Sequence, residues 1–340
     1  MKTLLITGGA GFIGTNAADY FASKNWKVIV LDNLSRNGSG ENLSWLESQK
    51  NYSIEFLKID ICDKQSIEQV FSEHSIDALI HLAGQVAVTE SVLNPKKDFE
   101  VNAVGTFNIL EAMRKFSPET IMINASTNKV YGQLDHLKII QEQDRYQFKS
   151  MFAGVSEEMP LDFHSPYGCS KGAADQYVID YARIYELKAT TFRQSCIYGP
   201  RQFGSEDQGW ISWFIHAALS EKEITIYGNG KQVRDILYID DLIFAYDLAI
   251  NKPNQIKGEA FNIGGGVRHS ISLMELIKML SKIIKKDILY HFAAVRPGDQ
   301  KVYISNAEKI KNFLGWEPEV SVGTGIKNTL EWTKENIQQI

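Results

Sequence analysis

A glycine-rich turn near the start of the chain restricts the possible folds more than any other feature. TGGAGFIG (7–14) follows an apolar run at 2–7 and precedes a segment, 12–24, with helical apolar spacing. Glycines in such a strand–turn–helix unit allow the tight turn and let a pyrophosphate approach the unpaired N–H groups of the helix. The alternative is a tight turn without a ligand. The turn predicts a dinucleotide site that includes Gly8, Gly11, Phe12, Ile13 and Gly14.

Strand-like and helical stretches then alternate along the first half of the chain. The strand-like runs lie at 26–32, 53–60, 77–83 and 120–126. Continuous apolar runs of this kind suit parallel strands that are buried on both faces, and right-handed crossovers place helices on each side of the sheet. The sequence therefore predicts an α/β fold, with a doubly wound parallel Rossmann-type sheet and a smaller α/β substrate domain.

The second half of the chain predicts a discontinuous second domain. Long helices are expected over 88–116 and 165–186, and loops alternate with short elements after Pro200. The strand-like segments 234–239 and 260–264 are expected to return to the first sheet. The prediction is a Rossmann domain that binds the cofactor at 1–195 plus 234–263, and a substrate domain at 196–233 plus 264–340.

Composition limits the partners and the location. The chain has 340 residues, with 36 Lys and Arg against 41 Asp and Glu, a formal charge of −5. No segment is rich in Lys and Arg, which argues against nucleic acids and membrane surfaces as partners and favours small molecules. Three cysteines without Cys-x-x-Cys spacing indicate a reducing cytoplasm, and seven scattered histidines predict no metal site. We expect neither a targeting nor a transmembrane segment.

The predicted strand ends carry further candidates for the cofactor site. Asp32 lies where a carboxylate can accept hydrogen bonds from the adenosine ribose and repel a 2′-phosphate, which favours NAD over NADP. Arg36 either reaches a 2′-phosphate or is a solvated loop residue. Asp60 either lies beside the adenine or caps a helix. The cofactor set also includes Asn33, Ser35, Arg36, Asp60, Ile61, Leu82, Ala83 and Gly84.

A tyrosine and a lysine four residues apart form the catalytic candidate. Such pairs occur at Tyr20/Lys24, Tyr167/Lys171 and Tyr227/Lys231. Only Tyr167/Lys171 opens a long predicted helix, after Pro166, and follows a strand that ends in Ser126-Thr127. The pair Tyr227/Lys231 spans a Gly-Asn-Gly turn, and Tyr20/Lys24 lies on the back of the first helix. The context therefore selects Tyr167 and Lys171.

The chemistry of this pair suits proton transfer. A phenol has an ordinary pKa near 10. A neighbouring Lys171 ammonium and a positively charged nicotinamide would both favour its ionised form. The Thr127 hydroxyl can hydrogen-bond the same substrate oxygen. The alternative is an exposed Tyr and Lys on a surface helix.

The ordered motifs resemble a known superfamily over nearly the whole chain. TGGAGFIG, HLAG, STNKVYG, SPYGCSK, YGPRQF and VRDILYIDD, together with Asp32, resemble the extended short-chain dehydrogenases/reductases that act on nucleotide sugars. STNKVYG, EDQGW and GNGKQVRD are similar to the branch that inverts C2 of a CDP-linked deoxysugar. The resemblance implies tightly bound NAD, a CDP-sugar substrate, catalysis by Thr127, Tyr167 and Lys171, and a cofactor role for Asn102. It also implies a homo-oligomer, a dimer or tetramer, although the apolar stripes of the long helices suit the core equally.

The two residues that directly follow Thr127 distinguish subfamilies of this superfamily by their chemistry. Related sugar 4,6-dehydratases carry an Asp-Glu pair there, because elimination of water needs an added acid and base. This chain has Asn128-Lys129, which cannot serve as that pair. Simple hydride chemistry is therefore favoured over dehydration, and polar contacts that fix the loop suit these residues equally.

The resemblance also gives a substrate set. Cys196 replaces an asparagine that contacts substrate in many members, which suggests altered substrate placement. The segment 149–164 resembles a substrate-side flap. Arginines of this set suit a diphosphate or form surface ion pairs. The full set is Gln85, Thr127, Asn128, Cys196, Arg201, Gln208, Arg234 and Arg296.

Two classes of function follow from these observations. The first is an NAD-dependent epimerase that inverts C2 of a CDP-deoxysugar through a transient 2-keto sugar; a UDP- or GDP-sugar 4-epimerase or a reductase is the alternative among enzymes. The second is a non-catalytic NAD-binding sensor or scaffold on the same fold. The intact set of Thr127, Tyr167 and Lys171 favours the enzyme.

Overall fold

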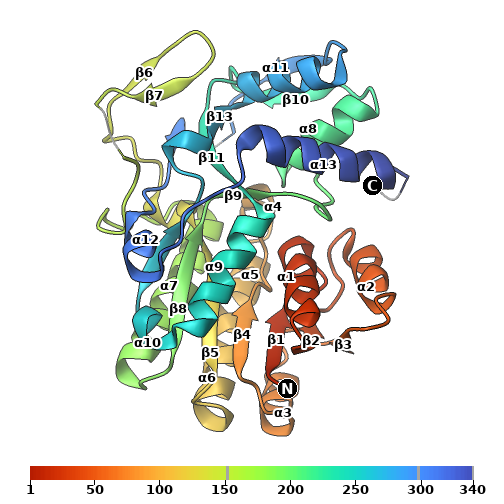
Figure 1. Ribbon diagram of the computed structural model, residues 1–340. Helices are drawn as coiled ribbons and strands as arrows, with labels where there is room; N and C mark the ends of the chain where they lie inside the picture. The colour runs from red at the N-terminus through yellow and green to blue at the C-terminus, as the bar shows by residue number, and fades with distance from the viewer. Residues whose placement is uncertain (151–152, 297–298, 339–340) are drawn as a thin grey trace.

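A parallel sheet forms the centre of the larger lobe (Figure 1). The computed structural model describes residues 1–150, 153–296 and 299–338. Within these ranges seven strands run in the order β12-β8-β5-β4-β1-β2-β3, and each neighbouring pair is parallel. The strands are β1 (Thr3–Thr7), β2 (Lys27–Leu31), β3 (Ser53–Leu57), β4 (Ala78–His81), β5 (Ile121–Thr127), β8 (Ala189–Gln194) and β12 (Ala260–Ile263). The predicted Rossmann-type α/β fold is confirmed.

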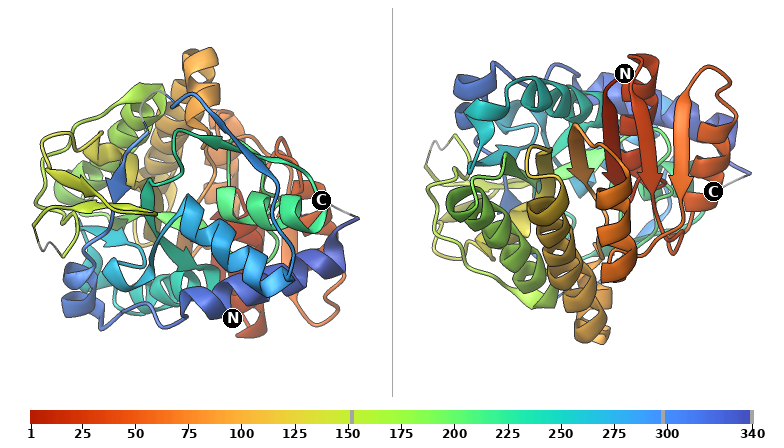
Figure 2. Two further views of the ribbon diagram at one scale, coloured as in Figure 1. Left: turned by 90° about the horizontal axis from the view of Figure 1, so that it is seen from above. Right: turned by 90° about the horizontal axis from the view of Figure 1, so that it is seen from below.

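Helices cover both faces of this sheet. Leu4 and Ile6 of β1 pack on one face and Leu5 on the other, because side chains alternate along a strand. The first face carries α1 (Phe12–Ser23), α2 (Ser39–Glu47) and α9 (Ile239–Asn251). The second face carries α3 (Lys64–Glu73), α6 (Gly105–Phe116) and α7 (Ser165–Ile184), which lie side by side in the right view of Figure 2.

The helix predicted over 88–116 is interrupted. It divides into α4 (Val88–Leu93), α5 (Pro95–Phe99), a π-helical turn η1 (Glu100–Val104) and α6. Pro95 disfavours the helical conformation at Asn94, which has φ −137°, and the Asn94 side chain accepts a hydrogen bond from the Lys97 amide. The π turn holds Asn102 in the interior. The helix predicted over 165–186 matches α7.

The smaller lobe lies beyond the carboxyl ends of the main-sheet strands (Figure 1). Its elements are β9 (Cys196–Tyr198), β10 (Ile224–Tyr227), β11 (Val233–Tyr238), β13 (Ser270–Ser272), β14 (Tyr290–Ala293), β15 (Val302–Tyr303), α8 (Trp210–Leu219), α11 (Leu273–Ile284) and α13 (Val322–Asn336). The predicted return of 260–264 to the main sheet is confirmed by β12. The prediction for 234–239 is wrong, because β12 occupies the edge of β8 and β11 pairs with β9, β13 and β15 instead. The division into two domains stays a prediction.

Further short elements complete the two lobes. They are η2 (Asn128–Tyr131), β6 (Ile139–Gln141), β7 (Tyr146–Phe148), α10 (Pro253–Ile256), η3 (Val267–His269) and α12 (Glu308–Leu314). The β6–β7 hairpin is attached to the smaller lobe, since Arg145 donates to Ser270 at 2.7 Å. In the described ranges, none of the helices has the length and apolar composition needed to cross a membrane.

A buried ion pair attaches α7 to the sheet. Arg193 of β8 donates to both carboxylate oxygens of Asp175 of α7, at 2.9 and 3.1 Å, and the side chains are 4% and 0% exposed. The same guanidinium donates to the Tyr131 hydroxyl at 3.0 Å. Asp175 lies one helical turn after Lys171, so this contact fixes the part of α7 that carries the catalytic candidates.

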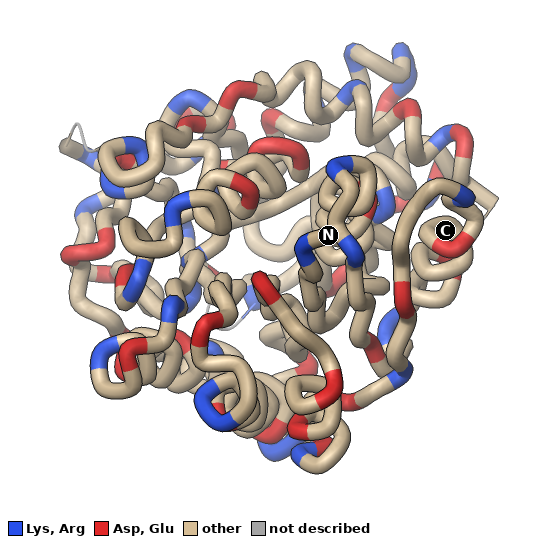
Figure 3. The backbone as a smooth tube through the Cα atoms, turned by 60° about the horizontal axis from the view of Figure 1, so that its bottom comes forward, with Lys and Arg blue, Asp and Glu red and all other residues tan. Residues whose placement is uncertain are grey.

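Ion pairs on the surface are far more exposed to water than the buried Asp175–Arg193 pair. Figure 3 shows acidic and basic positions interspersed along the chain. Arg183 and Asp180 of α7 form one such pair, 3.7 Å apart, with side chains 70% and 55% exposed. Water screens exposed pairs, so this pair contributes little to stability.

Asp175→Asn is expected to lower the free energy of unfolding by about 3 kcal/mol or more, because it leaves the buried Arg193 charge without its carboxylate. Asp180→Asn is the matched control and is expected to change that free energy by less than about 1 kcal/mol. Urea unfolding followed by circular dichroism measures both. Equal effects of the two substitutions would contradict a special role for the buried pair.

Candidate active site

The glycine turn between β1 and α1 leaves no room for a side chain at several of its glycines, as Gly8 and Gly14 show. Gly8 has φ +67°, and a Cβ there would lie 2.8 Å from the Ala83 amide nitrogen, just after β4. A Cβ at Gly14 would lie 2.3 Å from the Gly8 carbonyl oxygen. Helix α1 begins at Phe12, and no side chain caps its first amides. The turn therefore fits a dinucleotide, whose pyrophosphate these N–H groups would bind.

Asp32 joins this turn to the loop after β2. Its carboxylate accepts hydrogen bonds from the Ala10 amide at 3.1 Å and the Leu34 amide at 2.8 Å. Burial raises the pKa of Asp32, and the two amides and the Arg36 charge oppose this rise. Arg36 also lowers the pKa of Tyr167, so the guanidinium acts across the space between β2 and α7.

Asp60 does not cap a helix. The N-cap of α3 is Asp63, which accepts hydrogen bonds from the Gln65 and Ser66 amides. Asp60 instead accepts from the Asn33 side chain at 2.8 Å and from the Cys62 amide at 2.9 Å. The alternative of an N-cap is wrong, and Asp60 connects the loops after β2 and β3. Its contact with the adenine stays a prediction.

Asn102 holds the loop after β4 against α7. Its Oδ1 accepts a hydrogen bond from the Gln85 amide at 2.9 Å, and its Nδ2 donates to the Ser170 hydroxyl at 3.0 Å. A Cβ at Gly84 would lie 2.9 Å from the same Oδ1, so this loop needs a glycine. The Gln85 side chain donates to Asp98 at 2.9 Å. The Gln85 side chain thus anchors this loop, and its contact with the substrate stays a prediction.

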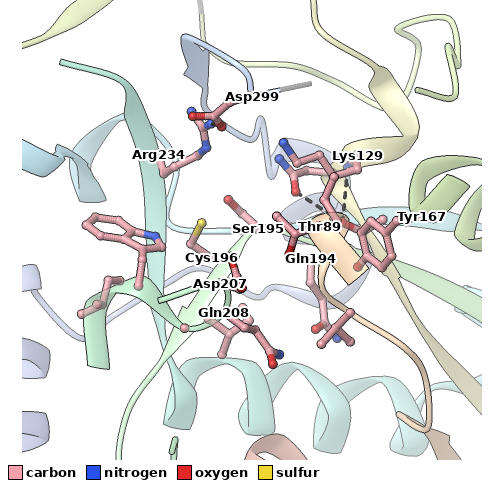
Figure 4. A pocket seen from close by; sticks show the side chains of 18 of the residues that line it. Thr89, Lys129, Tyr167, Gln194, Ser195, Cys196, Asp207, Gln208, Arg234 and Asp299 are labelled. Carbon is pink, nitrogen blue, oxygen red and sulfur yellow. Dashed lines mark hydrogen bonds and ion pairs between the residues drawn. The ribbon is translucent and has the colours of Figure 1, made fainter. Parts of the chain in front are cut away.

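Thr127, Tyr167 and Lys171 meet at the carboxyl end of β5. Thr127 ends the strand, Tyr167 lies in the first turn of α7, and Lys171 follows one turn later. Figure 4 shows Tyr167 beside Lys129 and Gln194 at the pocket. Burial raises the pKa of Tyr167 to about 12, which a hydrogen bond with Thr127 opposes.

Lys171 does not lower the pKa of Tyr167 as the sequence predicted. Its ammonium donates to the Ala125 carbonyl at 2.5 Å, and burial lowers its pKa to about 8. The groups that lower the Tyr167 pKa are Thr127 and Arg36, rather than the expected Lys171. A base near neutral pH therefore requires the further positive charge that an oxidised nicotinamide supplies when bound.

A pocket of about 750 Å³ extends from this triad into the smaller lobe. Arg234 is paired with Asp299 at 2.5 Å, and Arg296 with Asp207 at 2.9 Å. The predicted site residues that line the pocket are Phe12, Ile13, Leu82, Thr127, Asn128, Tyr167, Lys171, Cys196, Gln208, Arg234 and Arg296.

Several pocket residues were not predicted from the sequence. The Arg296 guanidinium lies 3.8 Å from the centre of the Tyr227 ring, and the Tyr227 hydroxyl donates to Glu206 at 2.6 Å. Glu206 and Asp207 stand beside Gln208 in the EDQGW motif, and this motif could have indicated them from the sequence. No sequence motif indicates Asp299, because only the fold brings it to Arg234.

Arg201 does not line the pocket, and its contact with the substrate stays a prediction. Its guanidinium lies 3.0 Å from the centre of the Trp45 ring of α2. The Pro200 and Arg201 carbonyls accept hydrogen bonds from Asn16 at 3.1 Å and Asn42 at 3.3 Å. The loop after β9 is therefore folded against α1 and α2, and Arg201 packs on Trp45.

For the segment 149–164, the role of a substrate-side flap stays a prediction. Its described residues do not line the pocket, and Val155 forms a β-bridge with Ser305. Residues 151–152 of this segment lie outside the described ranges. The bridge attaches Val155 to the chain just after β15.

A glycine turn and a buried Tyr–Lys pair at one edge of a doubly wound sheet define a short-chain dehydrogenase/reductase of the extended type. The family described as GDP-mannose 4,6 dehydratase matches residues 5–329. The chain belongs to this family of nucleotide-sugar epimerases and dehydratases. It is an NAD-dependent nucleotide-sugar epimerase.

Individual relatives agree with this assignment. The CDP-paratose 2-epimerase of Salmonella typhi is 46% identical over 335 residues, which cover 97% of this chain and 98% of that protein. The UDP-glucose 4-epimerase of Thermotoga maritima, solved with UDP-glucose, has a TM-score of 0.83 at 32% identity, covering 98% of this chain and 99% of that one. The dTDP-glucose 4,6-dehydratase of Bacillus anthracis, solved with NAD, has a TM-score of 0.82 at 28% identity and covers 100% and 98%.

NAD is expected to stay bound through purification, because an epimerase returns the hydride to the same sugar and has no need to exchange its cofactor. Acid-released supernatant then absorbs as NAD. Asp32→Ala is expected to reduce the NAD content more than Arg36→Ala does, since the Asp32 carboxylate faces the ribose in this assignment. The reverse order would indicate NADP.

Tyr167→Phe is expected to reduce turnover on the order of 10²-fold or more, because it removes the proton acceptor and keeps the ring. Tyr20→Phe is the control. Its hydroxyl contacts Lys24 and Asp247 between α1 and α9, away from the pocket. The turnover rates of the two NAD-loaded variants test the assignment of Tyr167 as the proton acceptor. An inactive Tyr20→Phe together with an active Tyr167→Phe would contradict that assignment.

Proposed function

We propose that the protein inverts C2 of a CDP-linked deoxysugar and converts CDP-paratose to CDP-tyvelose through a transient 2-keto sugar. The observation that carries this proposal is the identity of the two residues that follow Thr127. Asn128 and Lys129 line the pocket there, in place of the carboxylate pair that dehydration needs. The identity of 46% to a CDP-paratose 2-epimerase supports C2 as the reacting carbon.

The side chains of the pocket suit this chemistry. NAD, when bound, accepts a hydride from the sugar and returns it. Tyr167 takes the proton of the C2 hydroxyl, and Thr127 hydrogen-bonds to the same oxygen and orients it. Lys171 donates to the Ala125 carbonyl, which holds its ammonium at the carboxyl end of β5. The ketone then turns in the pocket, Tyr167 returns the proton to the oxygen, and C2 is inverted with no net oxidation.

We further propose that the protein is a cytoplasmic homo-oligomer that pairs through α4 and α7. Large apolar side chains are exposed along these helices and α6, namely Val92, Leu93, Phe107, Tyr177 and Ile184. An exposed apolar face of this kind suits a two-fold interface between copies. The free cysteines Cys62 and Cys169 are exposed, which suits a reducing compartment. A monomeric mass in light scattering would contradict the oligomer.

The NAD-loaded protein is expected to convert CDP-paratose when tested against CDP-, UDP-, GDP- and dTDP-sugars, with products identified by NMR. Conversion of a UDP- or GDP-sugar at C4 alone would replace the proposal with a 4-epimerase. No turnover of any sugar would favour a non-catalytic NAD-binding protein. The same assay in deuterated water is expected to place no deuterium at C2, because the hydride does not mix with solvent. Deuterium at C2 after one conversion would falsify the oxidation route.

A further inference from the structure

Lys129 lines the pocket between the catalytic triad and Arg234 (Figure 4). Strand β5 ends at Thr127, and the chain turns at once into η2. The Thr127 hydroxyl accepts a hydrogen bond from the Lys129 amide at 3.3 Å, and the Asn128 side chain donates to Gln300 at 3.1 Å. These contacts hold the turn on both sides. The backbone of Lys129 therefore has a fixed position relative to Thr127.

The groups that act on Lys129 come from three other segments. They are Cys196 of β9, Arg234 of β11 and Asp299. Arg234 and Asp299 form an ion pair, so their opposite charges offset each other. Burial raises the pKa of the Cys196 thiol. Burial and the nearby Arg234 lower the pKa of Lys129 to about 8. With that pKa, Lys129 is mostly protonated at neutral pH and suits an anionic group of the substrate.

We propose that the Lys129 ammonium binds the sugar-linked phosphate of the nucleotide sugar. The proposal rests on the proposed C2 chemistry. Only the C1–O–P linkage separates C2 from that phosphorus, so a sugar with C2 at Tyr167 brings its phosphate to the Thr127 side of the pocket, where Lys129 lies. With C4 at Tyr167, the sugar ring would separate the phosphate from this wall. Lys129 would therefore favour reaction at the carbon next to the anomeric centre.

Calorimetry with CDP and CMP on the NAD-loaded protein tests this proposal, because CMP lacks the phosphate that is linked to the sugar in the substrate. Lys129→Met keeps the approximate length of the side chain and removes the charge. It is expected to weaken CDP binding by about 10-fold or more, as for a lost hydrogen bond to a charged group, and to change CMP binding less than about twofold. Equal losses for both nucleotides, or no loss, would overturn the proposal. Lys64→Met, at an exposed position at the start of α3, is the control and leaves both affinities unchanged.

The pH dependence separates Lys129 from its neighbours. The affinity of the unchanged protein for CDP is expected to fall as the pH rises above about 8, because a neutral amine no longer attracts phosphate. Lys129→Arg retains the charge at these pH values and is expected to abolish this fall. Cys196, Arg234 and Asp299 are unchanged in that variant, so a fall that persists would overturn the role of Lys129. If Lys129→Met does not fold, the pH profile of Lys129→Arg is sufficient to test the proposal.

The outcomes distinguish this proposal from the proposed function. A protein that binds CDP through Lys129 but converts no CDP-sugar contradicts only the epimerase reaction. A protein that converts CDP-paratose while Lys129→Met binds CDP normally contradicts only the phosphate contact.

Discussion

Parallel pairing of the main-sheet strands is the constraint on which the site depends. Because neighbouring strands run in the same direction, their carboxyl ends meet at one edge, and the loops after β1, β2, β4 and β5 come together there. Gly8 allows the first loop to pass within contact distance of Ala83. The Asp175–Arg193 pair fixes α7 on β8, so Tyr167 and Lys171 are set relative to the same edge.

Burial is the main influence on the ionisation of the catalytic groups. It raises the pKa of the Tyr167 phenol to about 12 and lowers the pKa of Lys171 to about 8, so at neutral pH the phenol is neutral while Lys171 stays mostly protonated. The neutral phenol can take a proton from a hydroxyl only after its pKa falls. A positively charged cofactor ring would shift the phenol in the needed direction, and the chemistry is thereby coupled to the presence of oxidised cofactor.

The sequence predicted the features that depend on local chemistry and on strong patterns. The glycine turn, the strands of the Rossmann sheet and the helix that begins at Ser165 are of this kind. The break at Asn94 was missed although Pro95 signals it, because the apolar spacing continues through it. The position of Arg201 on Trp45 and the pairing of Arg234 with Asp299 could not be predicted, since both depend on how distant segments fold together.

The loop that starts at Pro200 connects the two lobes in an asymmetric way. Its first residues are bound to α1 and α2 through Asn16, Asn42 and Trp45, while Glu206 and Asp207, a few residues later, form part of the pocket wall. Glu206 accepts a hydrogen bond from Tyr227 of β10, and Asp207 lies three residues before α8, so this wall belongs to the smaller lobe although its loop is anchored on the larger one. One short stretch of backbone therefore links the helices beside the glycine turn to the Asp207–Arg296 ion pair at the other end of the pocket.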